Sequence, residues 1–157
     1  MAGYGLPNEQ HLSVVLQNSL ELEGHNIEIV NGSVSGSTSA GGLNIAEWTL
    51  SENNIDLMIL CLGANDMLRG INPKETKNNL EEIIKIAKSK NIKIIIAGMI
   101  APTSYGYSYK KSFDKIFSDL SKKYKLQLIP FLLEGVAQKP EFNLSDGMHP
   151  NDQGTII

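Results

Sequence analysis

Two apolar runs separated by a helical pattern constrain the fold of this chain more than any other feature. Residues 55–63 (IDLMILCLG) and 92–100 (IKIIIAGMI) are almost continuously apolar, as strands buried on both faces of a parallel sheet are. Residues 72–90 begin with an N-cap asparagine, a first-turn proline and an early glutamate, which together predict a helix. A buried strand, a helix and a second buried strand predict a parallel α/β arrangement.

The same alternation extends over the rest of the chain. We predict further strands at 27–31 and 126–130, and further helices at 9–23, 45–50, 108–123 and from about Asn151 to the cut-off at Ile157. The pattern therefore predicts a single three-layer α/β/α domain over residues 1–157 with a mainly parallel sheet. The first helix, unlike the others, follows no strand, so we expect a first strand to be missing.

Size and charge limit the class of partner. The chain has 157 residues, a length that suits one domain. Its 14 basic and 17 acidic side chains give a net charge of −3. No basic run is dense enough to bind nucleic acid or an anionic membrane, so the expected partner is a small molecule. No segment reaches the ~18 to 20 apolar residues of a membrane span. Oligomeric state and a periplasmic or cytoplasmic location stay open.

Cys61 is the only cysteine in the sequence. A single cysteine excludes an internal disulfide, and its place inside an apolar run predicts a small buried core residue instead of a reactive thiol. The sequence therefore leaves the redox compartment undetermined.

Three small-residue loops follow the predicted strands. In open parallel sheets, ligands bind beyond the carboxyl ends of the strands. The loops after residues 31, 62, 100 and 130 are therefore expected to form one functional rim, which carries GSVSG (32–36), GAND (63–66) and APTSYG (101–106).

Asp146 and His149 lie three residues apart in the turn-rich segment DGMHP. At this spacing the carboxylate can meet the imidazole, fix its tautomer and stabilise its protonated form, as the base of a hydrolase requires. The alternative is that Asp146 caps a turn and His149 lies on the surface without a role. His11 and His25 lack the spacing of a zinc motif, and no metal site is predicted.

Asn65 and Gly36 are candidates for oxyanion donors. Asn65 follows a predicted strand, where its amide can point N–H groups at an oxyanion or can close an Asx turn. Gly36 can bring a backbone N–H close to a substrate, or it can belong to a flexible serine-rich loop. That loop lacks the lysine and the glycine spacing of phosphate and dinucleotide sites. Tyr105, Tyr107 and Tyr109 either line a pocket or serve as packing.

Five segments in this order resemble the GDSL or SGNH esterase family, in particular its bacterial arylesterase and thioesterase I branch: NGSVSGST, CLGANDMLRG, AGMIAPTSYG, LIPFLLEGV and DGMHPN. The resemblance extends over essentially the whole chain. It implies a flavodoxin-like sheet and the hydrolysis of carboxylic esters or thioesters, with lysophospholipids among the candidate substrates. This chemistry proceeds through a serine acyl-enzyme and requires no metal or organic cofactor.

The resemblance also implies roles for individual residues. Matched to the family's motifs, Gly36 and Asn65 resemble two oxyanion-hole donors. His149 resembles the general base, and Asp146 resembles the residue that orients it.

The family's nucleophilic serine lies in a Gly-Asp-Ser-Leu block that ends its first strand. The segment after that block resembles residues 2–6 (AGYGL) here, so the matching serine is expected just before Met1. The family motif assigns no nucleophilic role to Ser33, Ser35 or Ser37.

The resemblance places the first strand in the interior of the sheet. Four or five buried apolar side chains, at roughly 1.5 to 3 kcal/mol each, contribute about 6 to 15 kcal/mol. Whole domains are stable by only about 5 to 15 kcal/mol. We therefore predict that residues 1–157 are a fragment, truncated at both ends and inactive as it stands, of a complete esterase.

A second hypothesis is a non-catalytic relative that binds an ester, lipid or glycan without cleaving it. Phosphoryl transfer is disfavoured, because the sequence has neither a phosphate loop nor a carboxylate cluster for magnesium. Acyl-chain length, leaving group and the choice between ester and thioester depend on pocket shape, which the spacing of motifs does not determine.

Overall fold

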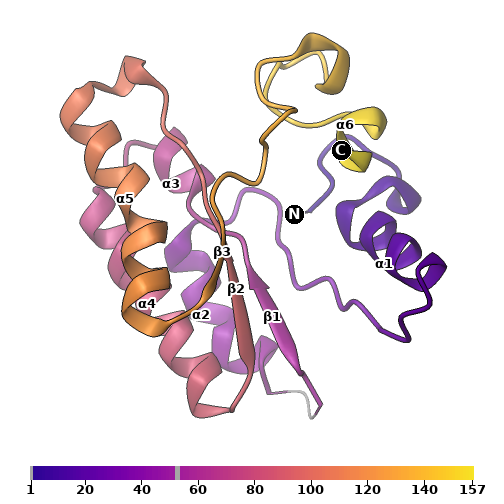
Figure 1. Cartoon of the computed structure of the whole chain (residues 1–157). Coiled ribbons are helices and arrows are strands. Elements are labelled where there is room, and N and C mark those ends of the chain that lie inside the picture. The colour runs from indigo at the N-terminus through magenta and orange to yellow at the C-terminus, as the bar shows by residue number, and fades with distance from the viewer. Residues whose placement is uncertain (1, 52–53) are drawn as a thin grey trace. The chain divides into compact units, whose positions relative to one another are not determined.

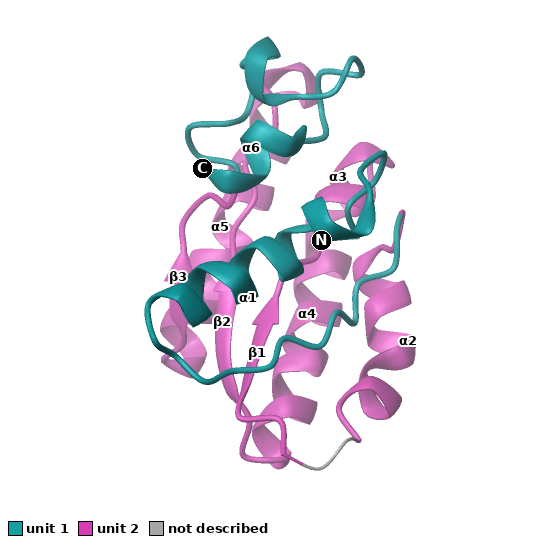
Figure 2. Ribbon diagram, turned by 90° about the vertical axis from the view of Figure 1, so that its right-hand side faces the viewer, with its two compact units in different colours: residues 1–35, 133–157 teal, residues 36–132 magenta. Residues whose placement is uncertain are grey.

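The computed structural model describes residues 2–51 and 54–157 and divides the chain into two compact units (Figures 1 and 2). Unit 1 comprises Met1–Ser35 and Leu133–Ile157, and unit 2 comprises Gly36–Leu132. Among the residues described, no helix is long and apolar enough to cross a membrane.

Unit 2 contains a parallel sheet of three strands in the order β1 (Leu57–Leu60), β2 (Lys93–Ala97) and β3 (Gln127–Ile129). All three lie inside segments that the sequence predicted as strands. The register places Met58 of β1 opposite Ile94, and Ile96 of β2 opposite Leu128. The predicted parallel α/β arrangement is confirmed in this unit.

Three helices pack on one face of this sheet: α2 (Ser39–Thr49), α4 (Pro73–Ser89) and α5 (Tyr107–Tyr124) (Figure 1). The core between sheet and helices includes the buried side chains of Leu60, Leu80, Ile84, Ile94, Ile96, Phe113, Ile116 and Leu120. The Asn72 side chain caps α4 by accepting the Lys74 N–H at 2.9 Å, as its sequence predicted. Helix α2 begins well before the predicted residue 45, because Thr38 caps it through the Gly41 N–H at 3.2 Å.

Strand β1 differs from the prediction of a strand buried on both faces. Leu60 is buried against the helices, whereas Leu57 and Ile59, which point to the opposite face, are 46% and 45% exposed. Within the described residues, β1 pairs with β2 and with no other strand. Its continuous apolar sequence indicated the strand correctly, but the unit 2 helices cover only one face of the sheet.

Unit 1 contains α1 (Leu12–Leu22), α6 (Asp152–Ile156) and two 3-10 helices, η1 (Asn8–Gln10) and η3 (Pro140–Phe142). Helix α1 contacts α6, and α6 contacts η3. Both α1 and α6 lie within predicted helices.

The strand predicted at 27–31 is wrong. This segment has no regular structure, Val30 is exposed, and the Ile29 N–H donates to Oε1 of Gln17 at 2.9 Å. A β-branched run favours a strand only where a neighbouring strand accepts its backbone hydrogen bonds. Here the Ile29 N–H is satisfied by a side chain instead.

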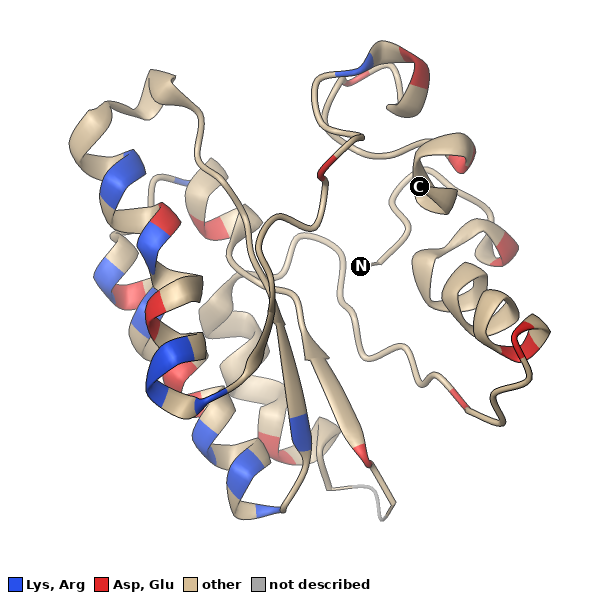
Figure 3. Ribbon diagram, viewed as in Figure 1, with Lys and Arg blue, Asp and Glu red and all other residues tan. Residues whose placement is uncertain are grey.

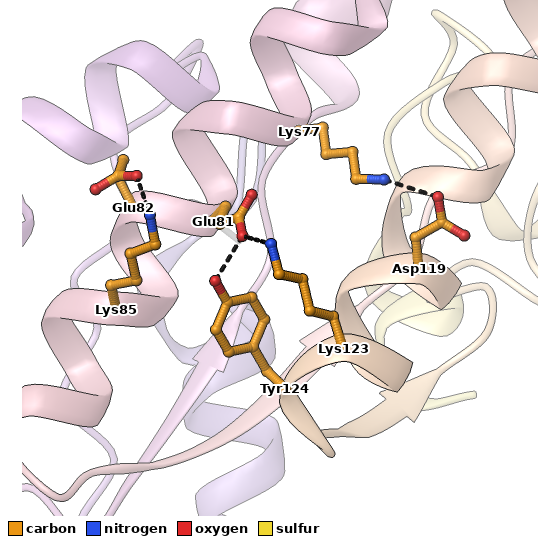
Figure 4. Close-up of polar contacts among 7 residues, drawn as sticks. All are labelled: Lys77, Glu81, Glu82, Lys85, Asp119, Lys123 and Tyr124. Carbon is orange, nitrogen blue, oxygen red and sulfur yellow. Dashed lines mark hydrogen bonds and ion pairs between the residues drawn. The ribbon is translucent and has the colours of Figure 1, made fainter.

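Charged residues of both signs alternate along α4 and α5, whereas residues 1–35 contain no lysine or arginine (Figure 3). Three interhelical bonds result: Lys77 Nζ donates to Asp119 at 2.8 Å, and Glu81 accepts from Lys123 and, at 2.5 Å, from the Tyr124 hydroxyl (Figure 4). The bonds from Lys123 and Tyr124 lower the pKa of the Glu81 carboxyl.

Glu81→Gln should destabilise the protein more than Glu82→Gln does. The Glu81 side chain is 15% exposed and joins two helices, whereas that of Glu82 is 53% exposed and pairs with Lys85 on its own helix. Because the pKa of Glu81 is lowered by folding, its stabilisation is present above the unfolded value of about 4.3 and is lost as the pH falls through the lower folded value. In thermal unfolding at neutral pH we expect Glu81→Gln to lower Tm by about 2 to 4 °C, with a smaller difference in acid. Equal Tm values for the two variants at neutral pH would contradict this.

Candidate active site

Residues 143–151 of unit 1 form a turn closed by backbone hydrogen bonds. The Leu144 N–H donates to the His149 carbonyl at 2.7 Å, and the Gly147 N–H donates to the Leu144 carbonyl at 2.9 Å. Asn143 and Pro150 form an antiparallel bridge beside it. The backbone that carries Asp146 and His149 is therefore determined locally.

The Asp146 carboxylate holds both this turn and the imidazole of His149. Its Oδ1 accepts the backbone N–H groups of Met148 at 2.8 Å and His149 at 3.0 Å, and its Oδ2 lies 2.7 Å from His149 Nδ1. The contact expected from the spacing is present. The alternative left open by the sequence is also correct in part, because Asp146 caps the turn and the His149 side chain is 42% exposed.

The electrostatics of this pair favour one tautomer of His149. The backbone N–H groups of His149 and Met148, and then the His149 ring, lower the pKa of the Asp146 carboxyl to about 2. An ionised carboxylate can only accept hydrogen bonds, so Nδ1 of the ring carries the proton. The basic lone pair is then on Nε2, the nitrogen that a proton-transfer base uses.

Asn65 lies in a short helix of unit 2 that the sequence did not predict, α3 (Ala64–Leu68), just beyond the carboxyl end of β1. Its Nδ2 donates to the Ser37 carbonyl at 3.0 Å, and Nη2 of Arg69, four residues later, donates to the Gly36 carbonyl at 3.0 Å. The segments that carry Asn65 and Gly36 are thus joined directly. The Asn65 side chain does not form the Asx turn that the sequence left open. Its amide nitrogen instead donates to the Ser37 carbonyl in a distant loop.

Gly36 adopts a left-handed backbone conformation with φ of +73°. A Cβ there would meet only the Arg69 guanidinium, at 3.9 Å, so the preference for glycine comes from the backbone angle and not from crowding. Gly36 as a residue is exposed, and no hydrogen bond from its backbone N–H is found among the described residues. This N–H is therefore available to a bound oxygen.

Asp66 is the residue of this region that sequence reasoning missed. Its side chain is fully buried and accepts the Ser39 N–H at 2.7 Å, the Ser39 hydroxyl, and the Thr76 hydroxyl at 3.1 Å. Asn79 in turn donates to the Ser39 hydroxyl at 3.0 Å. The carboxylate thereby joins the starts of α2, α3 and α4, and its only signal in the sequence was its place next to Asn65.

Two of the three tyrosines, Tyr105 and Tyr109, serve as packing. The Tyr109 hydroxyl donates to the Ile71 carbonyl at 2.9 Å, and its ring stacks on Tyr105 and Phe113 with centroids 5.5 and 5.9 Å apart. Tyr107 is exposed. Tyr109 also borders an open surface hollow, whose other lining residues are Gly70, Asn72, Pro73, Lys74, Ser108 and Ser112.

The lone cysteine and the two other histidines of the sequence make packing or local polar contacts. Cys61 was predicted as a buried core residue, and the structure shows it partly buried against the core. Burial raises the pKa of its thiol, which disfavours the reactive thiolate. Nε2 of His11 lies 3.1 Å from the Leu6 carbonyl, and His25 lies 3.9 Å from Glu23. Within residues 2–51 and 54–157, no three histidine, cysteine or acidic side chains are grouped so as to hold a metal ion.

Comparisons with known proteins agree with one another. Residues 1–155 match the family described as GDSL-like lipase/acylhydrolase. The chain is 36% identical to an arylesterase of Vibrio mimicus over 152 residues, which are 97% of this chain and 76% of the relative. It is 35% identical to thioesterase 1/protease 1/lysophospholipase L1 of Escherichia coli strain K12 over 123 residues, 78% of this chain and 59% of that protein.

The fold also resembles a solved structure. The crystal structure of AlinE4, an SGNH-hydrolase family esterase, superposes with a TM-score of 0.89 at 39% sequence identity, and the match covers 98% of this chain and 82% of AlinE4. The structural likeness and the sequence relatives therefore indicate the same group of ester hydrolases.

The carboxyl of Asp146 should titrate with a midpoint near 2. Because this pKa is below its unfolded value of about 3.9, the stabilisation it gives is present above that value and is lost as the pH falls through about 2. A ¹³C titration of the carboxyl by NMR measures the midpoint directly. His149→Ala keeps the backbone donors, which are the larger causes, so its Asp146 pKa should stay below the ordinary range. A midpoint near 4 in the unaltered protein would refute the geometry described.

Proposed function

Because this chain belongs to the GDSL-like lipase/acylhydrolase family, we propose that it acts in a serine esterase that hydrolyses carboxylic esters through an acyl-enzyme. The observation that carries this proposal is the 2.7 Å contact between Asp146 Oδ2 and His149 Nδ1. The names of the relatives suggest aryl esters, acyl thioesters and lysophospholipids as the substrate range.

In the proposed reaction, His149 is the general base. Its Nε2 takes the proton of a serine hydroxyl as the serine oxygen attacks the ester carbonyl, and later gives that proton to the leaving oxygen or sulfur. A water molecule then attacks the acyl-enzyme in the same way, which releases the acid and restores the serine. Asp146 keeps the ring in the Nδ1–H tautomer and stabilises the imidazolium that forms at each step.

Gly36 and Asn65 are the proposed oxyanion donors. The backbone N–H of the exposed residue Gly36 and the second N–H of the Asn65 amide have no acceptor among the described residues, which supports this role. The first N–H of that amide is bound to the Ser37 carbonyl, so the direction of the second is set before substrate arrives. Donors held in advance stabilise a developing negative charge without a cost for reorienting them.

The nucleophilic serine is proposed to lie outside residues 1–157, in the Gly-Asp-Ser-Leu block that the resemblance implies. We further propose that the complete protein is one three-layer domain with a flavodoxin-like sheet, in which another strand pairs with β1. The half-exposed apolar side chains of Leu57 and Ile59 and the unpaired edge of β1 in unit 2 support this arrangement.

A protein extended at its N-terminus through the Gly-Asp-Ser-Leu block should hydrolyse a short p-nitrophenyl ester, whereas residues 1–157 alone should not. In the extended protein, His149→Ala should abolish most turnover, and His25→Ala, which removes an exposed histidine of the same unit, should not. Hydrolysis by residues 1–157 that depends on His149 would place the nucleophile inside this chain. An extended protein that binds esters without cleaving them would instead favour the non-catalytic hypothesis.

Asn65→Ala in the active protein should lower kcat by about 100 to 1000 fold, the usual loss when one oxyanion donor is removed. Asn78→Ala is the matched control, because Asn78 is an exposed asparagine on α4. Both variants are measured with the same p-nitrophenyl ester, and circular dichroism checks their folding. Turnover close to normal in a folded Asn65→Ala protein rules out the role of Asn65.

A further inference from the structure

The ring of Tyr4 lies against the imidazole of His149. Their centroids are 4.6 Å apart and their planes are inclined by 36°. Tyr4 is 58% exposed, so this contact is not forced by burial in a core. Both residues belong to unit 1, although 145 positions separate them in the sequence.

The turn that carries Tyr4 is held by His11. Leu6 N–H donates to the Gly3 carbonyl at 3.0 Å, which closes a turn over residues 3–6, and the Leu6 carbonyl lies 3.1 Å from Nε2 of His11. Gly3 has φ of +63°, and a Cβ there would lie 1.9 Å from Cδ2 of His11. His11 therefore touches both ends of the turn, with Tyr4 between them.

The bond to Asp146 leaves one motion of His149 unconstrained. A single hydrogen bond at Nδ1 constrains one atom of the ring, but the two side-chain torsions χ1 and χ2 can still change together, which rotates the ring and moves Nε2. A side chain packed on the ring face opposes this rotation, because turning the ring would drive it into its neighbour. Proton transfer is sensitive to displacements of this kind, since base and hydroxyl must meet within hydrogen-bond distance.

We propose that Tyr4 is a positioning residue for His149, and that His11 acts through it by holding the turn of residues 3–6. This inference rests on the proposed function, in which His149 is the general base. Tyr4 limits the orientations of the imidazole, and its aromatic face also lies within the ~6 Å over which a ring attracts a cation, such as the imidazolium formed during the reaction.

The expected effect on rate is small and specific. An aromatic face at an exposed site stabilises a cation by an amount that corresponds to about a two- to fivefold change in rate. Tyr4→Ala should therefore lower kcat by about that factor or somewhat more, with KM little changed, because the proposed contact is to the base and not to the substrate. Tyr4→Phe keeps the ring and should retain normal kcat.

The first measurement needs no catalytic activity. In the protein extended through the Gly-Asp-Ser-Leu block, nuclear Overhauser effects between the Tyr4 ring protons and the His149 ring protons should be observed, because the centroids lie 4.6 Å apart. In His11→Ala these effects should weaken. His25→Ala is the matched control and should leave these effects unchanged, since the His25 side chain is exposed and pairs only with Glu23 among the described residues.

The second measurement uses the active protein described under the proposed function. There His11→Ala should lower kcat about as much as Tyr4→Ala does, and the double variant should be no worse than either alone, because both act through one contact. Three results would each overturn the inference. One is the absence of nuclear Overhauser effects between the two rings, and another is a rise of KM with unchanged kcat in Tyr4→Ala. The third is a loss of kcat in Tyr4→Phe as large as that in Tyr4→Ala. If the nuclear Overhauser effects between the Tyr4 and His149 rings are present but the His149→Ala protein is fully active, the proposed function is wrong and the contact between the two rings is still confirmed.

Discussion

The buried carboxylate of Asp66 is the interaction on which the arrangement of unit 2 around Asn65 and Gly36 depends. A carboxylate removed from water is costly unless hydrogen-bond donors replace its hydration. Ser39 supplies two donors and Thr76 a third, so the carboxylate can stay buried only while α2, α3 and α4 begin where they do. The same contact determines where the segment after Gly36 enters α2, and therefore which backbone groups Asn65 and Arg69 can reach.

The pair of Asp146 and His149, unlike Asp66, is positioned by hydrogen bonds within a single turn. Its geometry comes from one tight turn, in which a single carboxylate accepts two backbone N–H groups with one oxygen and faces the imidazole with the other. Asp146 thus stabilises the turn that carries His149 and also orients the His149 ring. Asp146 therefore needs no distant side chain to be positioned, and its low pKa follows from the same donors.

The parts of the fold that could be predicted are those in which periodicity and local chemistry agree. Helix α4 has an asparagine cap, a first-turn proline and an apolar stripe, and its bounds were predicted within a residue or two. Strands β1 and β2 were recognisable as apolar runs too short for core helices. The segment 27–31 has the composition of a strand but not the structure, because pairing depends on a neighbour that composition does not describe. Helix α3 was missed because five residues are too few to show a period.

The sequence by itself determined the order β1, α4, β2, α5 and β3, the spacing that permits Asp146 to contact His149, and the family, because each depends on residues close in the chain or on motifs in a recognisable order. Tertiary structure alone decided that Asp66 is buried, that Arg69 and Asn65 bind the loop of Gly36, and that Tyr4 lies on the ring of His149. The physical reason is the same in each case. These contacts join residues from roughly thirty to nearly 150 positions apart, and a hydrogen bond or ring contact over such a separation forms only when packing elsewhere has already brought the two segments together.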